Sequence, residues 1–127
     1  MLISEMLISE FCYNINNIAI LSGPNHAEEV IKENPTASIV ASRNKSFRKL
    51  LQKKVSSNSF RLYTSDDIIG VQVGGAVKNV IAIASGLCEG LELGDNAQAT
   101  LVTRGLHEIS QLTKVYNFNS NTLYGLS

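Results

Sequence analysis

Lys78 is the residue whose surroundings in the sequence most strongly suggest chemistry. It is the one charged residue in the run GGAVKNVIAIASG, residues 74–86, which otherwise holds apolar and small residues and a single amide. Residues four apart share one face of a helix, and those that would share this face with Lys78 are all small: Gly70, Gly74 and Ala82. Because burial disfavours the charged form of an amine, a lysine held there can serve as a general base or acid.

The residues alone leave a structural role for this lysine open as the alternative. Lys78 would then reach along the helix to solvent, or pair with an acid such as Asp66 or Asp67. A glycine inside a helix costs about 1 kcal/mol relative to alanine, and this helix would contain three within six residues, Gly70, Gly74 and Gly75. We therefore expect another part of the molecule to approach this face closely.

The elements that must position Lys78 follow from the changing periodicity of the chain. Up to residue 65, β-favouring runs alternate with helical runs. The expected elements, in chain order, are a strand at 17–21, a helix at 26–34, a strand at 36–42, a helix at 45–55 and a strand at 59–65. Such alternation is typical of an α/β layer with a largely parallel sheet.

Beyond residue 65 the β-favouring runs stop and helical patterns follow. A long helix is expected with Ser65 or Asp66 as its N-cap, and a second helix from residue 94, where Asp95 and Gln98 resemble a capping box. The predicted fold class is therefore α/β followed by all-α.

The two ends of the sequence carry weaker signals. Residues 117–127 are rich in Asn and Ser and have no period, so a loop or a frayed edge is expected there. The first ten residues repeat MLISE, which is too short for a repeat architecture and is interpreted as a ragged start with one extended helix end.

Composition excludes several classes of partner. Eleven basic and eleven acidic residues give a formal net charge of zero, so no overall field attracts nucleic acid or an anionic membrane. The apolar start is interrupted by Glu5 and Glu10 and lacks a basic leader, which predicts neither a secretory signal nor a spanning helix. The two cysteines and two histidines lie far apart and predict no metal site or disulfide framework. We expect a soluble, cytoplasmic chain without membrane insertion.

Three segments closely resemble the bacterial NAD(P)-dependent glycerol-3-phosphate dehydrogenases. They are LSGPNHAEEV (21–30), FRLYTSDDIIGVQVGGAVKNVIAIASG (60–86) and GDNAQATLVTRGLHEI (94–109), in the order and spacing of the family. The resemblance implies an internal piece of that enzyme, a partial Rossmann-like sheet layer joined to the first helices of a helical C-terminal domain. Residues 1–64 would be the C-terminal part of the dinucleotide-binding domain, and residues 65–127 the start of the substrate domain.

The resemblance also implies an activity and a site. The family interconverts sn-glycerol 3-phosphate and dihydroxyacetone phosphate with NAD or NADP, and the lysine of its GGAxKN motif, here Lys78, is the proton acceptor for the substrate's secondary hydroxyl. Gly23 and Asn25 correspond to positions against glycerol 3-phosphate, and Ala27 to one against the cofactor. Asn79 corresponds to an amide at the substrate in related eukaryotic enzymes. The family often has Ser or Thr in place of Asn25, which can still form hydrogen bonds.

The sequence also departs from the family pattern. No G-x-G-x-x-G follows a strand, and the family's GLGDL aspartate and its Ser/Thr-Arg-Asn motif are absent. We therefore expect a chain truncated at both ends and inactive alone. The alternative belongs to a different class: a noncatalytic helical module that associates with a complementary piece, or forms a homodimer, through exposed apolar surfaces.

Overall fold

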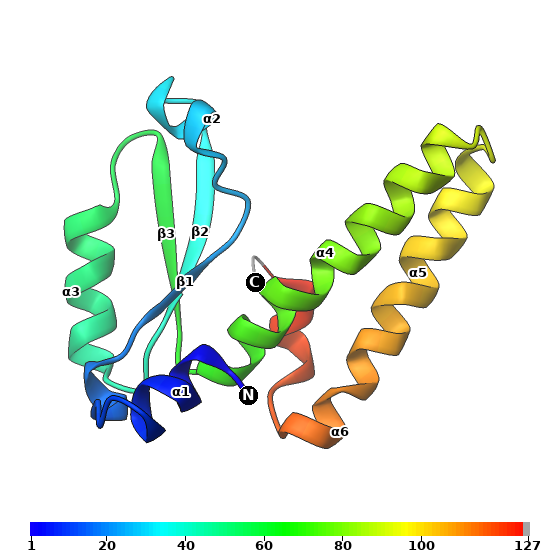
Figure 1. Cartoon of the computed structure of the whole chain (residues 1–127). Helices are drawn as coiled ribbons and strands as arrows, with labels where there is room; N and C mark the ends of the chain where they lie inside the picture. Colours follow the sequence, from blue (N-terminus) through cyan, green and yellow to red (C-terminus); the bar gives the residue numbers. More distant parts are fainter. Residues whose placement is uncertain (126–127) are drawn as a thin grey trace.

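The computed structural model describes residues 1–125 and shows an α/β layer beside a helical hairpin (Figure 1). Its first half contains, in chain order, α1 (Ile3–Ser9), η1 (Ile15–Asn17), β1 (Ile20–Ser22), α2 (Ala27–Ile31), β2 (Thr36–Ala41), α3 (Lys45–Val55) and β3 (Phe60–Ser65). Each strand and helix expected before residue 65 overlaps an observed one, and α3 has the predicted bounds. Among the described residues none after Ser65 lies in a strand, so the predicted fold class is confirmed.

The three strands form one sheet in the order β1-β2-β3. β2 and β3 are parallel, with Ser38 opposite Leu62, whereas β1 and β2 are antiparallel, with Leu21 opposite Val40. The expectation of a largely parallel sheet was therefore wrong for β1. A parallel connection needs a crossover, usually a helix, that returns the chain to the same end of the sheet. α3, with 11 residues, provides that return, but α2 has only 5, so the chain reverses directly into β2.

The sheet lies between α3 and the first turns of α4 (Ile68–Gly90) (Figure 1). Ala41 of β2 and Val71 of α4 are both 0% exposed and form a buried cluster with Ile68. Ile39 packs against the same cluster, because residues two apart in a strand face the same side of a sheet. Burying one such aliphatic side chain contributes about 1.5–3 kcal/mol. This contact fixes the start of α4 on the sheet.

The second half is helical. After α4 come α5 (Asp95–Gln111), α6 (Thr113–Tyr116) and the 3₁₀ helix η2 (Ser120–Tyr124). α4 and α5 run antiparallel as a hairpin that projects away from the sheet (Figure 1). They pack closely, because a Cβ added at Gly105 of α5 would lie 2.9 Å from Ile81 Cδ1 of α4.

The cap of α4 lies one or two residues later than predicted. Asp67 is the N-cap, and its Oδ1 accepts a hydrogen bond from the Gly70 N–H at 2.8 Å. Ser65 still belongs to β3, and its hydroxyl accepts from the Asp67 N–H at 3.1 Å. The strand thus continues to the position at which the sequence pattern would begin the helix.

The capping box predicted for α5 was wrong. The N-cap is Gly94, whose φ of +83° lies in the region that favours glycine. Glycine has no side chain that could accept a capping hydrogen bond. Gln98 instead donates through Nε2 to Ser85 Oγ at 2.7 Å. A bond across the helical hairpin has therefore replaced the local one.

The prediction of a loop or frayed edge was wrong for much of residues 117–125, while residues 126–127 lie outside the described part. Asn119 caps η2 by accepting from the Asn121 N–H at 3.0 Å, and Leu123 is only 2% exposed. A single buried leucine in a polar segment makes no periodic pattern. At the other end, the expected helix exists as α1, and Ser4 is bound to Gln72 of α4 through two hydrogen bonds of 2.7 and 3.0 Å.

By length and composition alone, α4 is also long and apolar enough to cross a membrane. The core helix of a soluble protein passes the same test, so this is weak evidence, and the absence of membrane insertion stays a prediction.

We expect Gly105→Ala to destabilise the chain and Gly86→Ala to stabilise it, although both replace a glycine inside a helix. Alanine improves helix propensity by about 0.5–1 kcal/mol at either site. At Gly86 an added Cβ meets nothing within 4 Å, whereas at Gly105 it must displace Ile81. Overpacking of that kind costs about 1–3 kcal/mol. Urea unfolding of both variants measures the difference, and equal stabilisation by the two would contradict the close packing of α4 on α5.

Candidate functional site

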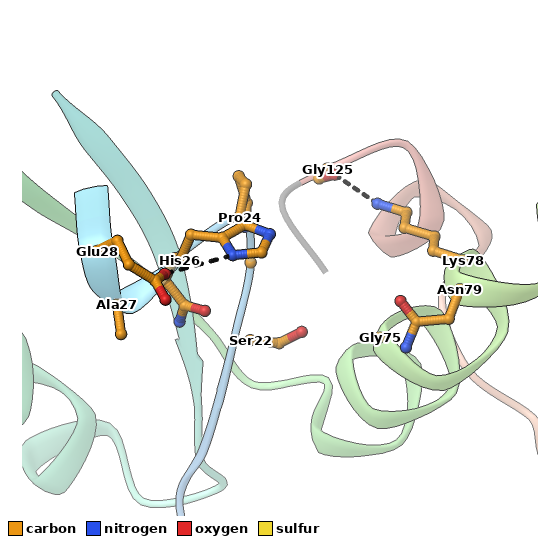
Figure 2. Close-up of a pocket in the computed structure, with 11 residues that line it drawn as sticks. Ser22, Pro24, His26, Ala27, Glu28, Gly75, Lys78, Asn79 and Gly125 are labelled. Carbon is orange, nitrogen blue, oxygen red and sulfur yellow. Dashed lines mark hydrogen bonds and ion pairs between the residues drawn. The ribbon is translucent and has the colours of Figure 1, made fainter. Parts of the chain in front are cut away.

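A pocket of about 800 Å³ lies between the turn after β1 and the middle of α4 (Figure 2). All five residues singled out from the sequence line it: Gly23, Asn25, Ala27, Lys78 and Asn79. Two segments that are far apart in the sequence therefore contribute to one site. The structure brings these residues together, and their individual roles stay predictions.

The turn after β1 forms one wall of the pocket. Gly23 has a φ of +132°, which L side chains rarely adopt, so a glycine is needed where the chain leaves the sheet. Asn25 and Ala27 follow and are exposed, which leaves both accessible to a ligand. The local sequence Gly-Pro-Asn thus turns the chain so that its polar residues border the pocket.

Gly75 brings α4 close to this turn. A Cβ added at Gly75 would lie 2.8 Å from the Ser22 hydroxyl at the end of β1. The close approach expected from the glycines therefore exists. Gly70, however, does not make room for the Lys78 amine. The space that a Cβ at Gly70 would occupy is taken by the Asp67 carboxylate and the Phe118 ring, whose Cδ2 would lie 3.0 Å from that Cβ.

Lys78 stands on the opposite wall, half-buried on α4. Its Nζ donates a hydrogen bond to the Gly125 carbonyl at 3.0 Å, the contact drawn in Figure 2. Desolvation by burial lowers the pKa of Lys78 from its ordinary value of 10.5. The unfolded chain then holds this proton more tightly, so the contribution of Lys78 to stability rises as the pH increases through the lowered pKa.

The structural alternative of an ion pair for Lys78 finds no support among the described residues. Asp66 lies 4.0 Å from Arg48, and Asp67 accepts hydrogen bonds from Gly70 and the C-terminal segment. A carbonyl partner leaves the amine without the carboxylate that would favour its charged form.

Several other lining residues were not predicted from the sequence. Ser22, His26 and Glu28 border the pocket beside the predicted turn residues, and Gly125 borders it beside Lys78. His26 and Glu28 lie 4.0 Å apart with side chains at least 80% exposed, so they form at most a weak pair. No sequence pattern pointed to Gly125, since its position depends on how η2 packs on α4.

The described residues offer little to hold a dinucleotide. The three strands are followed by Gly-Pro-Asn, Ser-Arg-Asn and Asp-Asp-Ile, and none of these turns has the Gly-rich pattern that cradles a pyrophosphate. Ala27, to which the family resemblance assigns a cofactor contact, lines the pocket. Among the described residues there is also no group of three metal-ligating side chains.

Comparison with known proteins identifies the two halves. A family model for the N-terminus of NAD-dependent glycerol-3-phosphate dehydrogenase matches residues 1–48, and the corresponding C-terminal model matches residues 67–127. The glycerol-3-phosphate dehydrogenase (NAD(P)+) of Halothermothrix orenii is 49% identical over 124 residues, 98% of this chain and 36% of the relative. That of Deinococcus radiodurans is 47% identical over 94% of this chain and 37% of the relative. The chain thus spans about a third of the length of these relatives.

Solved structures agree with the sequence matches. Glycerol-3-phosphate dehydrogenase of Coxiella burnetii superposes with a TM-score of 0.81 at 47% identity, over 85% of this chain and 33% of that one. The Plasmodium falciparum enzyme gives 0.86 at 31% identity, over 98% and 35%. An α/β layer joined to a helical part in this way is the architecture of a two-domain dehydrogenase. This chain belongs to the NAD(P)-dependent glycerol-3-phosphate dehydrogenase family.

We expect the acetylation of Lys78 to show a lower pH midpoint in the folded chain than in the urea-unfolded chain. The neutral amine is the reactive form, and burial raises its fraction at any pH below 10.5. Peptide mass spectrometry after brief acetylation, from neutral pH to about pH 11, follows this residue separately from the other lysines. Identical midpoints in the folded and unfolded chains would contradict the desolvation of the amine.

Proposed function

We propose that this chain forms part of an NAD(P)-dependent glycerol-3-phosphate dehydrogenase that interconverts sn-glycerol 3-phosphate and dihydroxyacetone phosphate. The observation that carries the proposal is the convergence of Lys78 and Asn79 with Gly23 and Asn25 in one pocket. The names of the relatives supply glycerol 3-phosphate as the substrate and NAD(P)+ as the cofactor, and the family resemblance supplies dihydroxyacetone phosphate as the product. The cytoplasm is the compartment that we propose for it.

Lys78 acts as the general base in this proposal. It accepts the proton of the secondary hydroxyl when glycerol 3-phosphate is oxidised, and returns it when dihydroxyacetone phosphate is reduced. Such a transfer needs the amine within about 2.6–3.2 Å of the hydroxyl oxygen in the complex. The lowered pKa of Lys78 makes the neutral, accepting form more available than for a solvated lysine.

The remaining residues hold the reactants. Asn25 and Asn79 can donate and accept hydrogen bonds at the oxygens of the substrate, and the Gly23 backbone lets the substrate approach closely. Ala27 would contact the NAD or NADP cofactor when it is bound. The nicotinamide of that cofactor supplies the hydride chemistry, while the residues of this chain position the substrate and move its proton.

The division of the chain follows the same assignment. We propose residues 1–64 as the C-terminal part of the dinucleotide-binding domain and residues 65–127 as the start of the substrate domain. The change from β3 to α4 near Ser65 supports this boundary.

A noncatalytic helical module is not favoured as the function. Val80, Ile83 and Leu87 on the far half of α4 are exposed and provide the apolar surface that such a module needs. That surface does not distinguish the two functions, because a larger dehydrogenase can cover it equally well. The matches to dehydrogenases over almost the whole chain support the enzyme instead.

Lys78→Ala should lower kcat about 10²–10⁴-fold in a full-length enzyme, because it removes the general base. The test uses a chimera in which the Halothermothrix orenii enzyme supplies the sequence that this chain does not span. Oxidation of NADH or NADPH with dihydroxyacetone phosphate measures turnover, and cofactor affinity should stay nearly unchanged. Near-normal turnover of this variant would return Lys78 to a structural role.

The 127-residue chain by itself should show no appreciable turnover in the same assay. Fixing the nicotinamide against the substrate carbon can supply about 7–11 kcal/mol of the barrier, and the described turns provide no grip for the pyrophosphate. The active chimera serves as the positive control. Robust turnover by the chain alone would show that this reasoning is wrong.

Asn25→Ala in the chimera should reduce kcat/KM for dihydroxyacetone phosphate by about 10-fold or more, if the amide bonds a charged or developing-charge oxygen. KM for the cofactor should change little, because Asn25 is assigned to the substrate. A loss confined to cofactor affinity would contradict that assignment.

A further inference from the structure

The Asp67 carboxylate uses both of its oxygens, and they serve different parts of the chain. Oδ1 caps α4 by accepting from the Gly70 N–H at 2.8 Å. Oδ2 accepts from the Thr122 hydroxyl at 2.6 Å and from the Asn119 N–H at 3.1 Å. One oxygen is enough to cap a helix. The second therefore ties the segment of residues 119–125, which contains η2, to the start of α4.

The same segment leads directly to the partner of the amine. The Gly125 N–H donates to the Thr122 carbonyl at 3.2 Å, and the Gly125 carbonyl accepts from Lys78 Nζ at 3.0 Å. Asp67 and Lys78 are about three turns apart on the same helix. The segment of residues 119–125 connects them a second time, because it forms hydrogen bonds to Asp67 and to Lys78.

Apolar packing also holds this segment, but in a different way. Leu123 is buried, and the Phe118 ring lies against the position of the missing Gly70 side chain. Apolar burial is non-directional, so it brings the segment to α4 without fixing its position along the helix. Hydrogen bonds to a carboxylate are directional and about twice as strong as neutral ones.

We propose that Asp67 is a positioning residue for Lys78. Its carboxylate holds residues 119–125 against α4, so that the Gly125 carbonyl keeps the amine at the pocket wall and partly covered. When the carboxylate is lost, the segment shifts and the amine becomes more hydrated. The consequence for catalysis rests on the proposed function, but the coupling between Asp67 and the amine does not.

Three variants of the 127-residue chain test this coupling. Asp67→Asn keeps the shape of the side chain and a good N-cap. It loses the negatively charged carboxylate that accepts hydrogen bonds from Thr122 and Asn119. Thr122→Val removes the hydroxyl donor and leaves Asp67 in place. The matched control is Asp66→Asn. The Asp66 side chain is 80% exposed, and its contact with Arg48 is long, at 4.0 Å, so its charge is expected to contribute little.

Two measurements report on the two ends of the segment. In Asp67→Asn and Thr122→Val, the pH midpoint for Lys78 acetylation should move up toward that of the unfolded chain. Amide hydrogen exchange in residues 119–125 should become about tenfold faster or more. Asp66→Asn should change neither. The other titratable groups that line the pocket, His26 and Glu28, are the same in every variant, as is Tyr124, which precedes Gly125 in the chain.

The outcomes separate a positioning role from a purely structural one. If Asp67→Asn lowers thermal stability but leaves the Lys78 midpoint and the exchange at control values, the proposal is overturned. If the midpoint shifts in Asp67→Asn and Thr122→Val only, it is supported. In the active chimera, Asp67→Asn should then lower kcat and move the pH–rate profile in the same direction.

The test also distinguishes this inference from the proposed function. Full turnover by the Lys78→Ala chimera would reject Lys78 as the base, while a shifted acetylation midpoint in Asp67→Asn would still support the coupling. Loss of turnover in Lys78→Ala, together with an unchanged midpoint in Asp67→Asn, would reject the coupling alone.

Discussion

The burial of the first turns of α4 against the sheet is the contact on which the rest of this structure depends. Val71 of α4 and Ala41 of β2 are completely buried, and Ile68 closes the cluster. Because a helix is stiff, fixing its first turns also fixes the direction in which it leaves the sheet. Lys78, further along α4, therefore lies opposite the turn after β1, and the pocket exists because of a contact that includes none of its own residues.

The chemistry of the pocket depends on what surrounds the amine. A lysine beside a carboxylate would stay charged, whereas partial burial beside a neutral carbonyl lowers its pKa. The acids near the start of α4 are engaged elsewhere, Asp66 toward Arg48 and Asp67 in capping and in holding the C-terminal segment. Neither of these two acids therefore pairs with Lys78, whose amine donates to the Gly125 carbonyl instead.

The two halves carry different parts of the proposed site. The helical half carries the amine, and the α/β half carries the turn that faces it, but the described turns lack the Gly-rich grip for a pyrophosphate. This agrees with a chain that spans about a third of the length of its relatives. In the function that we propose, the chain thus carries more of the proton-transfer side of the site than of the hydride side.

Local patterns in the sequence were enough for much of this. The alternation of strands and helices, the bounds of α3 and the switch to an all-helical half follow from hydrophobic periodicity and turn residues, which act over short distances. The position of Lys78 among small residues is also a short-range pattern, so the sequence alone shows it. The family resemblance added Gly23, Asn25, Ala27 and Asn79, which the structure brings to the same pocket.

Other features could be decided only by tertiary structure. The antiparallel β1, the replacement of the α5 capping box by the Gln98–Ser85 bond, and the burial of Leu123 each result from contacts between residues distant in the chain. The partner of Lys78 is the clearest case, since Gly125 is 47 residues away in a segment without a periodic pattern. Sequence periodicity reports which face of an element is apolar, but not which distant backbone group will meet a side chain once those faces are packed.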